Sequence, residues 1–85
     1  MKETILIVDD AEFSRSVMKQ ALFNAGFDNI LEATTAEETR KIFESESPDL
    51  TVLDIMLPDN FDLKLLYELL SLNKEARIVI NSAIN

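Results

Sequence analysis

Two short apolar runs, each ending abruptly in aspartate, constrain the fold of this chain more than any other feature. Residues 5–8 lead directly into Asp9 and Asp10, and residues 50–53 lead directly into Asp54. Short apolar runs rich in β-branched side chains are typical of strands buried on both faces of a parallel sheet. The carboxyl ends of such strands lie at one edge, where open α/β sheets bind their ligands. We therefore expect these three carboxylates to gather at one edge of a sheet.

The spacing of apolar residues elsewhere predicts strands that alternate with helices, in the order βαβαβαβ. This order is typical of an α/β fold with a parallel sheet and right-handed crossovers. The predicted strands are 4–8, 29–33, 50–53 and 77–80, and the predicted helices are 12–25, 36–45 and 62–72.

Each predicted helix carries an apolar face and end signals. Gly26 is placed for a left-handed cap after the first helix, and Thr35 with Glu38 forms a capping box before the second. Pro48 lies beyond the second helix, where it cannot prolong it. The inward-facing residues are expected to be Phe13, Val17, Met18, Ala21, Leu22 and Ala25 in the first helix, Ala36, Ile42 and Phe43 in the second, and Leu63, Leu66, Leu69 and Leu70 in the third.

Composition narrows the class of protein. Residues 1–85 make one small domain, and the absence of cysteine excludes disulfides and fits a reducing cytoplasm. The net charge of −8 argues against direct binding of nucleic acid, which needs clustered basic residues. The apolar run near the start is too short for a signal peptide or a membrane span. The acidity serves either solubility or a negative pocket that attracts a cation.

The predicted pattern stops directly after a strand. Such a strand would form an exposed edge of the sheet and leave part of one face without a helix. We therefore expect a domain that is incomplete at its C-terminus, or one that completes its fold with a partner, including a second copy.

The three aspartates have ordinary as well as functional interpretations. Asp10 can cap the helix that follows it, and Asp54 can be a turn residue. Their joint position at strand ends favours a hard divalent cation, Mg²⁺ above all, held by carboxylate oxygens. Asp54 would then be both a metal ligand and a nucleophile towards an activated phosphoryl group. Ser82 follows the fourth strand and is placed to donate a hydrogen bond to a phosphoryl oxygen.

Three segments resemble the receiver domain of two-component response regulators, the CheY-like fold. Residues 5–10 (ILIVDD) look like the opening strand and acidic pair of that family. Residues 48–58 (PDLTVLDIMLP) look like its phosphoacceptor segment, with a proline four residues after the aspartate. Residues 78–83 (IVINSA) look like its fourth strand and switch Ser/Thr. The resemblance implies a doubly wound, flavodoxin-like parallel sheet of strand order 2-1-3-4 that lacks the last helix, strand and helix.

The resemblance also implies a function and a set of site residues. Asp54 would be phosphorylated, and Asp9, Asp10 and the backbone carbonyl of Met56 would complete its Mg²⁺ site. Ser82 would move towards the phosphoryl group and couple phosphorylation to the outer surface. The phosphoryl donor would be a histidine kinase or a phosphohistidine domain, and a downstream protein would read the result. Such a domain is a regulatory phosphoacceptor rather than an enzyme acting on other substrates.

Two departures from the family pattern matter, and the incomplete fold leaves an alternative open. The family lysine from the fifth strand is absent, and Lys74 and Arg77 lie at the wrong end of the fourth strand to replace it. The glycine turn usual before the third helix is also absent, with Phe61 and Asp62 in its place. The alternative is a non-phosphorylated interaction module that pairs through its open sheet edge.

Two enzyme or cofactor classes fit less well. A phosphohydrolase of the haloacid-dehalogenase type needs a second acid where Met56 stands. A dinucleotide-binding domain needs glycines in the first strand–helix turn, and residues 9–11 contain none.

Overall fold

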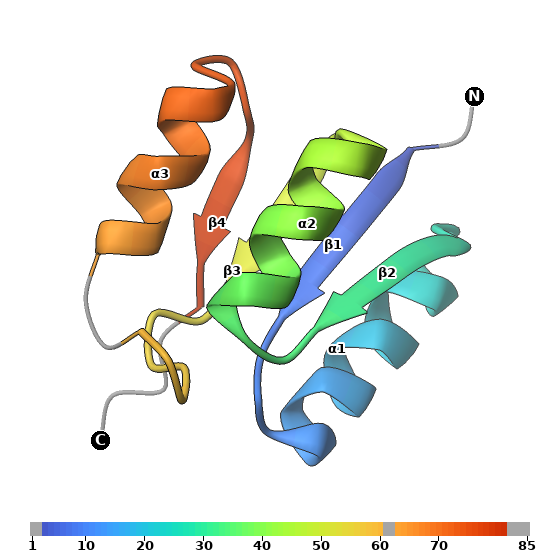
Figure 1. Ribbon diagram of the computed structural model, residues 1–85. Helices are drawn as coiled ribbons and strands as arrows, with labels where there is room; N and C mark the ends of the chain where they lie inside the picture. Colours follow the sequence, from blue (N-terminus) through green and yellow to red (C-terminus); the bar gives the residue numbers. More distant parts are fainter. Residues whose placement is uncertain (1–2, 61–62, 82–85) are drawn as a thin grey trace.

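The computed structural model describes residues 3–60 and 63–81. Within these ranges, strands alternate with helices as the sequence predicts (Figure 1). The elements are β1 Thr4–Val8, α1 Glu12–Asn24, β2 Asn29–Ala33, α2 Ala36–Glu46, β3 Leu50–Leu53, α3 Lys64–Leu72 and β4 Ile78–Ile80.

The strands form one parallel sheet in the order β2-β1-β3-β4, which confirms the predicted topology. At the end of the central strand, Val8 pairs with Ala33 of β2 and with Leu53 of β3. Leu53 in turn pairs with Ile80 of β4. Because the strands end level with one another, the residues that follow them emerge at one edge of the sheet.

Helices cover the two faces of this sheet unequally. Helices α2 and α3 lie on one face, and α1 lies on the other (Figure 1). Side chains alternate between the two faces along a strand, so Leu6 and Val8 of β1 point towards α2 while Ile5 and Ile7 point towards α1. All four are at most 1% exposed, and each stabilises the fold by about 2 kcal/mol. The main core consists of Leu6, Val8, Ala33, Ala36, Phe43, Leu53, Leu57, Leu65 and Leu69.

A glycine ends α1 as the sequence predicts. Gly26 has φ of 103°, a conformation that costs a residue without a side chain little. The Phe27 N–H donates to the Leu22 carbonyl and the Gly26 N–H donates to the Phe23 carbonyl. These two bonds form a Schellman motif and satisfy carbonyls that the end of the helix would otherwise leave free.

The N-cap of α2 is the residue that the sequence predicts, whereas its C-cap was not predicted. The Thr35 hydroxyl accepts a hydrogen bond from the Glu38 N–H, as expected of the N-cap. The Glu38 carboxylate accepts from the N–H and hydroxyl of Thr34, so it reaches one residue further back than a standard capping box. At the C-terminus Ser47, with φ of 46°, takes the left-handed cap position.

The prediction for the inner face of α3 is partly wrong. The helix begins at Lys64, and residues 61–62 lie outside the described ranges. Leu63 is 39% exposed, because it occupies the N-cap, where the backbone is not yet helical. Leu65 is buried in its place, together with the expected Leu69.

The prediction for the inner face of α1 is also partly wrong. Phe13 is 81% and Val17 54% exposed, and α1 has no buried residue. Arg15 and Lys19 both reach Glu32 of β2, which directs that flank of α1 towards β2. Helical spacing then places Val17 on the flank of α1 that faces away from β2. In the described part of the chain, α1 alone covers this face (Figure 1), so that flank has no neighbour.

Candidate functional site

The structure brings Asp9, Asp10 and Asp54 together at the carboxyl edge of the sheet. One carboxylate oxygen from each residue lies within 4.8 Å of those of the other two. The hydrogen-bond ladder of the sheet continues into these residues: the Asp9 N–H donates to the Ala33 carbonyl at 3.1 Å, and the Asp54 N–H donates to the Val8 carbonyl at 2.9 Å. The backbone of the site is therefore held by the sheet itself.

The alternative role of Asp10 as a helix cap does not hold. In the described structure the N-cap of α1 is Ala11, and no side chain caps that helix end. It is Asp9 whose carboxylate accepts a hydrogen bond from the Ala11 N–H, at 2.9 Å. This bond fixes the buried Asp9 side chain, while Asp10 stands exposed beside it.

Asp54 has an electrostatically strained carboxylate. Burial raises the pKa of Asp54 above its ordinary value, and the carboxylates of Asp9 and Asp10 raise it further. A hydrogen bond from the Met56 N–H, at 2.9 Å, acts in the opposite direction. A nearby cation would offset both the cost of burying the charged carboxylate and its repulsion from Asp9 and Asp10.

The donor set fits Mg²⁺. The ion prefers oxygen ligands at about 2.0–2.1 Å in octahedral geometry, so adjacent ligands lie about 2.9 Å apart and opposite ones about 4.1 Å apart. Carboxylate oxygens within 4.8 Å of one another need to move closer together by only about one or two ångströms to meet these spacings. An exposed acid such as Asp10 leaves room for the water ligands that Mg²⁺ usually keeps.

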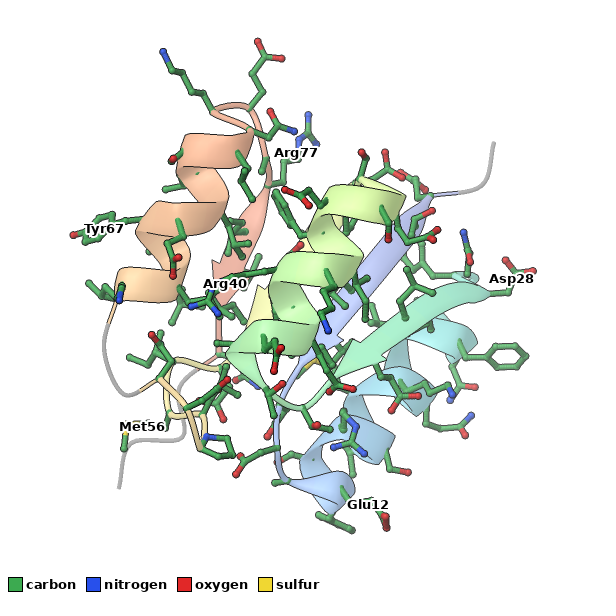
Figure 2. All side chains as sticks on the ribbon, viewed as in Figure 1. Glu12, Asp28, Arg40, Met56, Tyr67 and Arg77 are labelled. Carbon is green, nitrogen blue, oxygen red and sulfur yellow. The ribbon has the colours of Figure 1, made fainter. Side chains whose placement is uncertain are left out.

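The other two predicted site residues are less fully placed. Met56 lies two residues beyond Asp54, with its side chain 55% exposed and pointing away from the sheet (Figure 2). Only its backbone is therefore available to the acidic site, as the resemblance implies. Ser82 lies outside the described residues, and its role stays a prediction.

Arg15 is a residue of the site that the sequence did not indicate. Its guanidinium donates to the backbone carbonyl of Asp9 at 2.9 Å and to the Glu32 carboxylate at 2.9 Å. It therefore ties α1 to the end of β1 and to β2. Its partner Glu32 lies 17 residues away in the chain, so no local pattern reveals the contact.

Asp59 makes a second contact that the sequence did not reveal. It lies in the loop after Asp54, and its carboxylate accepts hydrogen bonds from the N–H groups of Ala36 and Glu37, at 2.7 and 3.2 Å. The loop after β3 is thereby attached to the N-terminus of α2, next to which it runs in Figure 1.

Arg77 lies far from the acidic edge, as the sequence predicts. It immediately precedes β4, and its carbonyl accepts from the Thr51 N–H near the start of β3. In Figure 2 Arg77 lies at the end of the sheet opposite Glu12 and Met56. It cannot contact a group bound at Asp54 in this fold.

Comparison with known proteins decides the family. A family model described as "Response regulator receiver domain" matches residues 5–85. The chain belongs to the response regulator receiver domain family. Receiver domains are regulatory phosphoacceptor domains of two-component systems. None of the helices within the described ranges is long and apolar enough to cross a membrane.

Relatives of this receiver domain include small chemotaxis proteins. Chemotaxis protein CheY of Bacillus subtilis is 36% identical over 83 residues, which cover 98% of this chain and 69% of that protein. A CheY-like receiver domain protein from Methanospirillum hungatei has a similar structure, with a TM-score of 0.91 at 29% identity, over 100% of this chain and 67% of the other. A chain in the crystal structure of histidine kinase ThkA in complex with response regulator protein TrrA gives a TM-score of 0.87 at 35% identity, over 100% and 72% of the two chains.

Proposed function

We propose that this receiver domain is a Mg²⁺-dependent phosphoacceptor that takes a phosphoryl group on Asp54. The observation that carries the proposal is the cluster of three carboxylate oxygens within 4.8 Å. Asp9, Asp10, Asp54 and the backbone carbonyl of Met56 would hold the ion. When bound, Mg²⁺ supplies positive charge that offsets the carboxylates and the transferred phosphoryl oxygens.

The step itself is a phosphoryl transfer to a carboxylate. An Asp54 oxygen forms a bond to phosphorus while the P–N bond of a phosphohistidine, protonated on its other ring nitrogen, breaks. The electron pair of that bond stays on the imidazole nitrogen, so neutral imidazole leaves. The product is an acyl phosphate on Asp54 and a free histidine on the donor. Ser82 would donate a hydrogen bond to a phosphoryl oxygen and thereby couple the modified site to partner contacts.

A histidine kinase or a phosphohistidine domain would be the donor. The similarity to a chain in the ThkA–TrrA complex supports a kinase partner. The absence of cysteine fits the reducing cytoplasm in which we propose that the domain acts. A downstream protein would read the phosphorylated state, since the net charge of −8 opposes direct contact with nucleic acid.

Intact-mass measurement after incubation with acetyl phosphate tests the proposal. With Mg²⁺ present we expect one phosphoryl adduct, formed when the Asp54 carboxylate attacks phosphorus and acetate leaves. Omitting Mg²⁺ should abolish the adduct, and so should Asp54→Asn, which keeps the shape of the side chain. A folded wild-type chain that forms no adduct under these conditions would overturn the proposal.

A second candidate function rests on the outer edge of β4. Val79 is 52% and Ile80 39% exposed. The Arg77 carbonyl and the Asn81 N–H bond to β3, and because residues of a parallel strand bond alternately to either side, the backbone groups of Ile78 and Ile80 face outwards. Such an edge can pair with another strand, in a second copy or in a partner.

Sedimentation velocity over a concentration series separates the two functions. An interaction module would form dimers or larger assemblies without phosphate or Mg²⁺, and Ile80→Lys would disperse them by placing a charge on the edge. A chain that stays monomeric at all concentrations and forms the adduct at Asp54 would leave the phosphoacceptor as the function.

A further inference from the structure

The segment between Asp54 and α3 is held in place at three points. Its first is the bond from the Met56 N–H to the Asp54 carboxylate. Its second is Leu57, whose side chain is 1% exposed and belongs to the main core. Its third is Asp59, whose carboxylate holds the Ala36 and Glu37 N–H groups of α2. The third ties the segment directly to the backbone at the N-terminus of α2.

The Asp59 contact is additional to the ordinary cap of α2. Thr35 already accepts from the Glu38 N–H, whereas Ala36 and Glu37 carry the two preceding N–H groups, which a helix leaves without internal partners. A negative carboxylate at this end of the helix is also favoured by the helix dipole. The backbone N–H groups of α2 lower the pKa of Asp59, which keeps the carboxylate charged and the contact intact.

The Asp59 contact fixes a tight turn that includes the neighbouring residues. Leu57 and Asn60 form an isolated bridge of two hydrogen bonds. The Leu57 N–H donates to the Asn60 carbonyl at 2.8 Å, and the Asn60 N–H donates to the Leu57 carbonyl at 3.2 Å. Asp59 lies inside this turn, so anchoring its side chain to α2 also anchors the Asn60 carbonyl that follows it.

The turn determines which way the Met56 carbonyl points. The Met56 carbonyl and the Leu57 N–H belong to one planar peptide unit, and in a trans peptide they point in opposite directions. Because the Leu57 N–H is committed to the Asn60 carbonyl, the Met56 carbonyl must point away from the turn. Its direction therefore depends on where the turn is held.

We infer that Asp59 is a positioning residue for the cation site: by attaching the turn 57–60 to the N-terminus of α2, it orients the Met56 carbonyl towards the acidic edge. This inference rests on the proposed function, in which that carbonyl is a Mg²⁺ ligand. It makes α2 part of the support of the site, although no side chain of α2 belongs to the acidic cluster.

Three substitutions in the full chain test the inference. Asp59→Ala removes the anchor of the turn. Thr35→Ala is the matched control, because it removes a cap from the same end of the same helix without touching the turn. Asp59→Asn removes the charge but keeps one oxygen that can accept from the Ala36 N–H. Isothermal titration with MgCl₂ gives the affinity, and the amide proton shift of Leu57 reports its bond to Asn60.

The inference predicts a distinct order of affinities. Asp59→Ala should weaken Mg²⁺ binding about 10-fold, as loss of a group that orients a metal ligand typically does, and should shift the Leu57 amide. Thr35→Ala should change Mg²⁺ affinity less than about 2-fold, although both caps stabilise the helix. Asp59→Asn should recover most of the wild-type affinity.

Each other outcome has a definite meaning. Equal Mg²⁺ affinity in Asp59→Ala and Thr35→Ala would reduce Asp59 to a helix cap and overturn the inference alone. An Asn variant as weak as the Ala variant would assign the effect to charge and overturn it as well. A folded wild type that takes up no Mg²⁺ would overturn the proposed function, and the inference with it. If Asp59→Ala does not fold by circular dichroism, Asp59→Ser takes its place, because its shorter hydroxyl cannot reach the Ala36 and Glu37 N–H groups. A Mg²⁺ affinity equal to that of Thr35→Ala, with an unshifted Leu57 amide, would then overturn the inference.

Discussion

Replacing Asp54 by asparagine should stabilise the protein when Mg²⁺ is absent. In the folded state the Asp54 carboxylate lies close to those of Asp9 and Asp10, with oxygens at most 4.8 Å apart, and unfolding relieves that repulsion. At this separation each pair of unit charges repels by about 0.9 kcal/mol in water and about 3.5 kcal/mol at an effective dielectric constant of 20. The removal of one residue abolishes two such pairs.

The expected gain is near the lower limit of this range. The site lies at an open edge with Asp10 exposed, and salt at about 0.1 M screens part of the repulsion. The variant also weakens the bond that Asp54 accepts from the Met56 N–H, because an amide oxygen is a poorer acceptor than a carboxylate. We expect a net increase in the free energy of unfolding of about 1 kcal/mol, which corresponds to a rise in Tm of about 4–8 °C for a domain of this size.

Thermal unfolding at neutral pH, followed by circular dichroism with EDTA or with excess MgCl₂, measures the effect. Mg²⁺ should raise the Tm of the wild type, because a ligand that binds only the folded state stabilises that state. The Tm of the variant, which lacks one of the proposed ligands, should change little. The control is Glu44→Gln on the exposed face of α2, which removes the same unit of charge and should change stability by less than about 0.5 kcal/mol.

The pH dependence gives an independent check. Since folding raises the pKa of Asp54 above its ordinary value of 3.8, ionisation of this group destabilises the folded state. The penalty is absent at low pH, grows as the pH rises above 3.8, and is complete above the folded pKa. The advantage of the variant should therefore disappear as the pH falls below 3.8. A variant no more stable than the wild type at neutral pH in EDTA would refute the reasoning.

Two further predictions concern buried and charged groups away from the acidic edge. Thr51→Val should raise the free energy of unfolding by about 1 kcal/mol, because the Thr51 hydroxyl is buried without a hydrogen-bond partner in the described structure. Thr39→Val should lower the free energy of unfolding by about 1 kcal/mol, because the equally buried Thr39 hydroxyl donates to the Thr35 carbonyl at 2.7 Å. Urea unfolding of the two variants compares these effects. Changes of the same sign would contradict the account. Hydrogen bonds from Lys19 and Arg15 lower the pKa of Glu32, so its contribution to stability is present above its unfolded pKa and is lost as the pH falls through the folded one. Glu32→Gln should thus destabilise the protein at neutral pH and lose that effect near pH 3, which urea unfolding at both pH values would show.

The sequence predicts the sheet well because each strand is a short apolar run with clear ends. The bounds of β1, β2 and β3 agree with the prediction, and β4 is one residue shorter. Helix faces are predicted less well, since periodicity identifies an apolar face without saying what covers it. Phe13 of α1 is exposed for this reason, whereas Leu65 of α3 is buried although it was not expected to be.

The candidate site was likewise predicted only in part. The three acids could be found because the pair Asp9 and Asp10 follows one strand and Asp54 follows another, and topology alone then brings them together. Asp59 and Arg15 could not, since their partners lie 23 and 17 residues away in the chain. Contacts of that kind depend on how the loop after β3 and helix α1 lie on the sheet, which no local pattern of residues specifies.

The hydrogen-bond ladder that continues from β1 and β3 into the acids determines how long the acidic site persists. The Asp9 and Asp54 N–H groups donate to carbonyls of the neighbouring strands, so their amide hydrogens can exchange with solvent only when the sheet opens. The central strand lies in the best-protected part of such a fold, where opening approaches complete unfolding. Asp54 cannot part from Asp9 unless β1 and β3 separate, so the acidic site lasts as long as the folded molecule does.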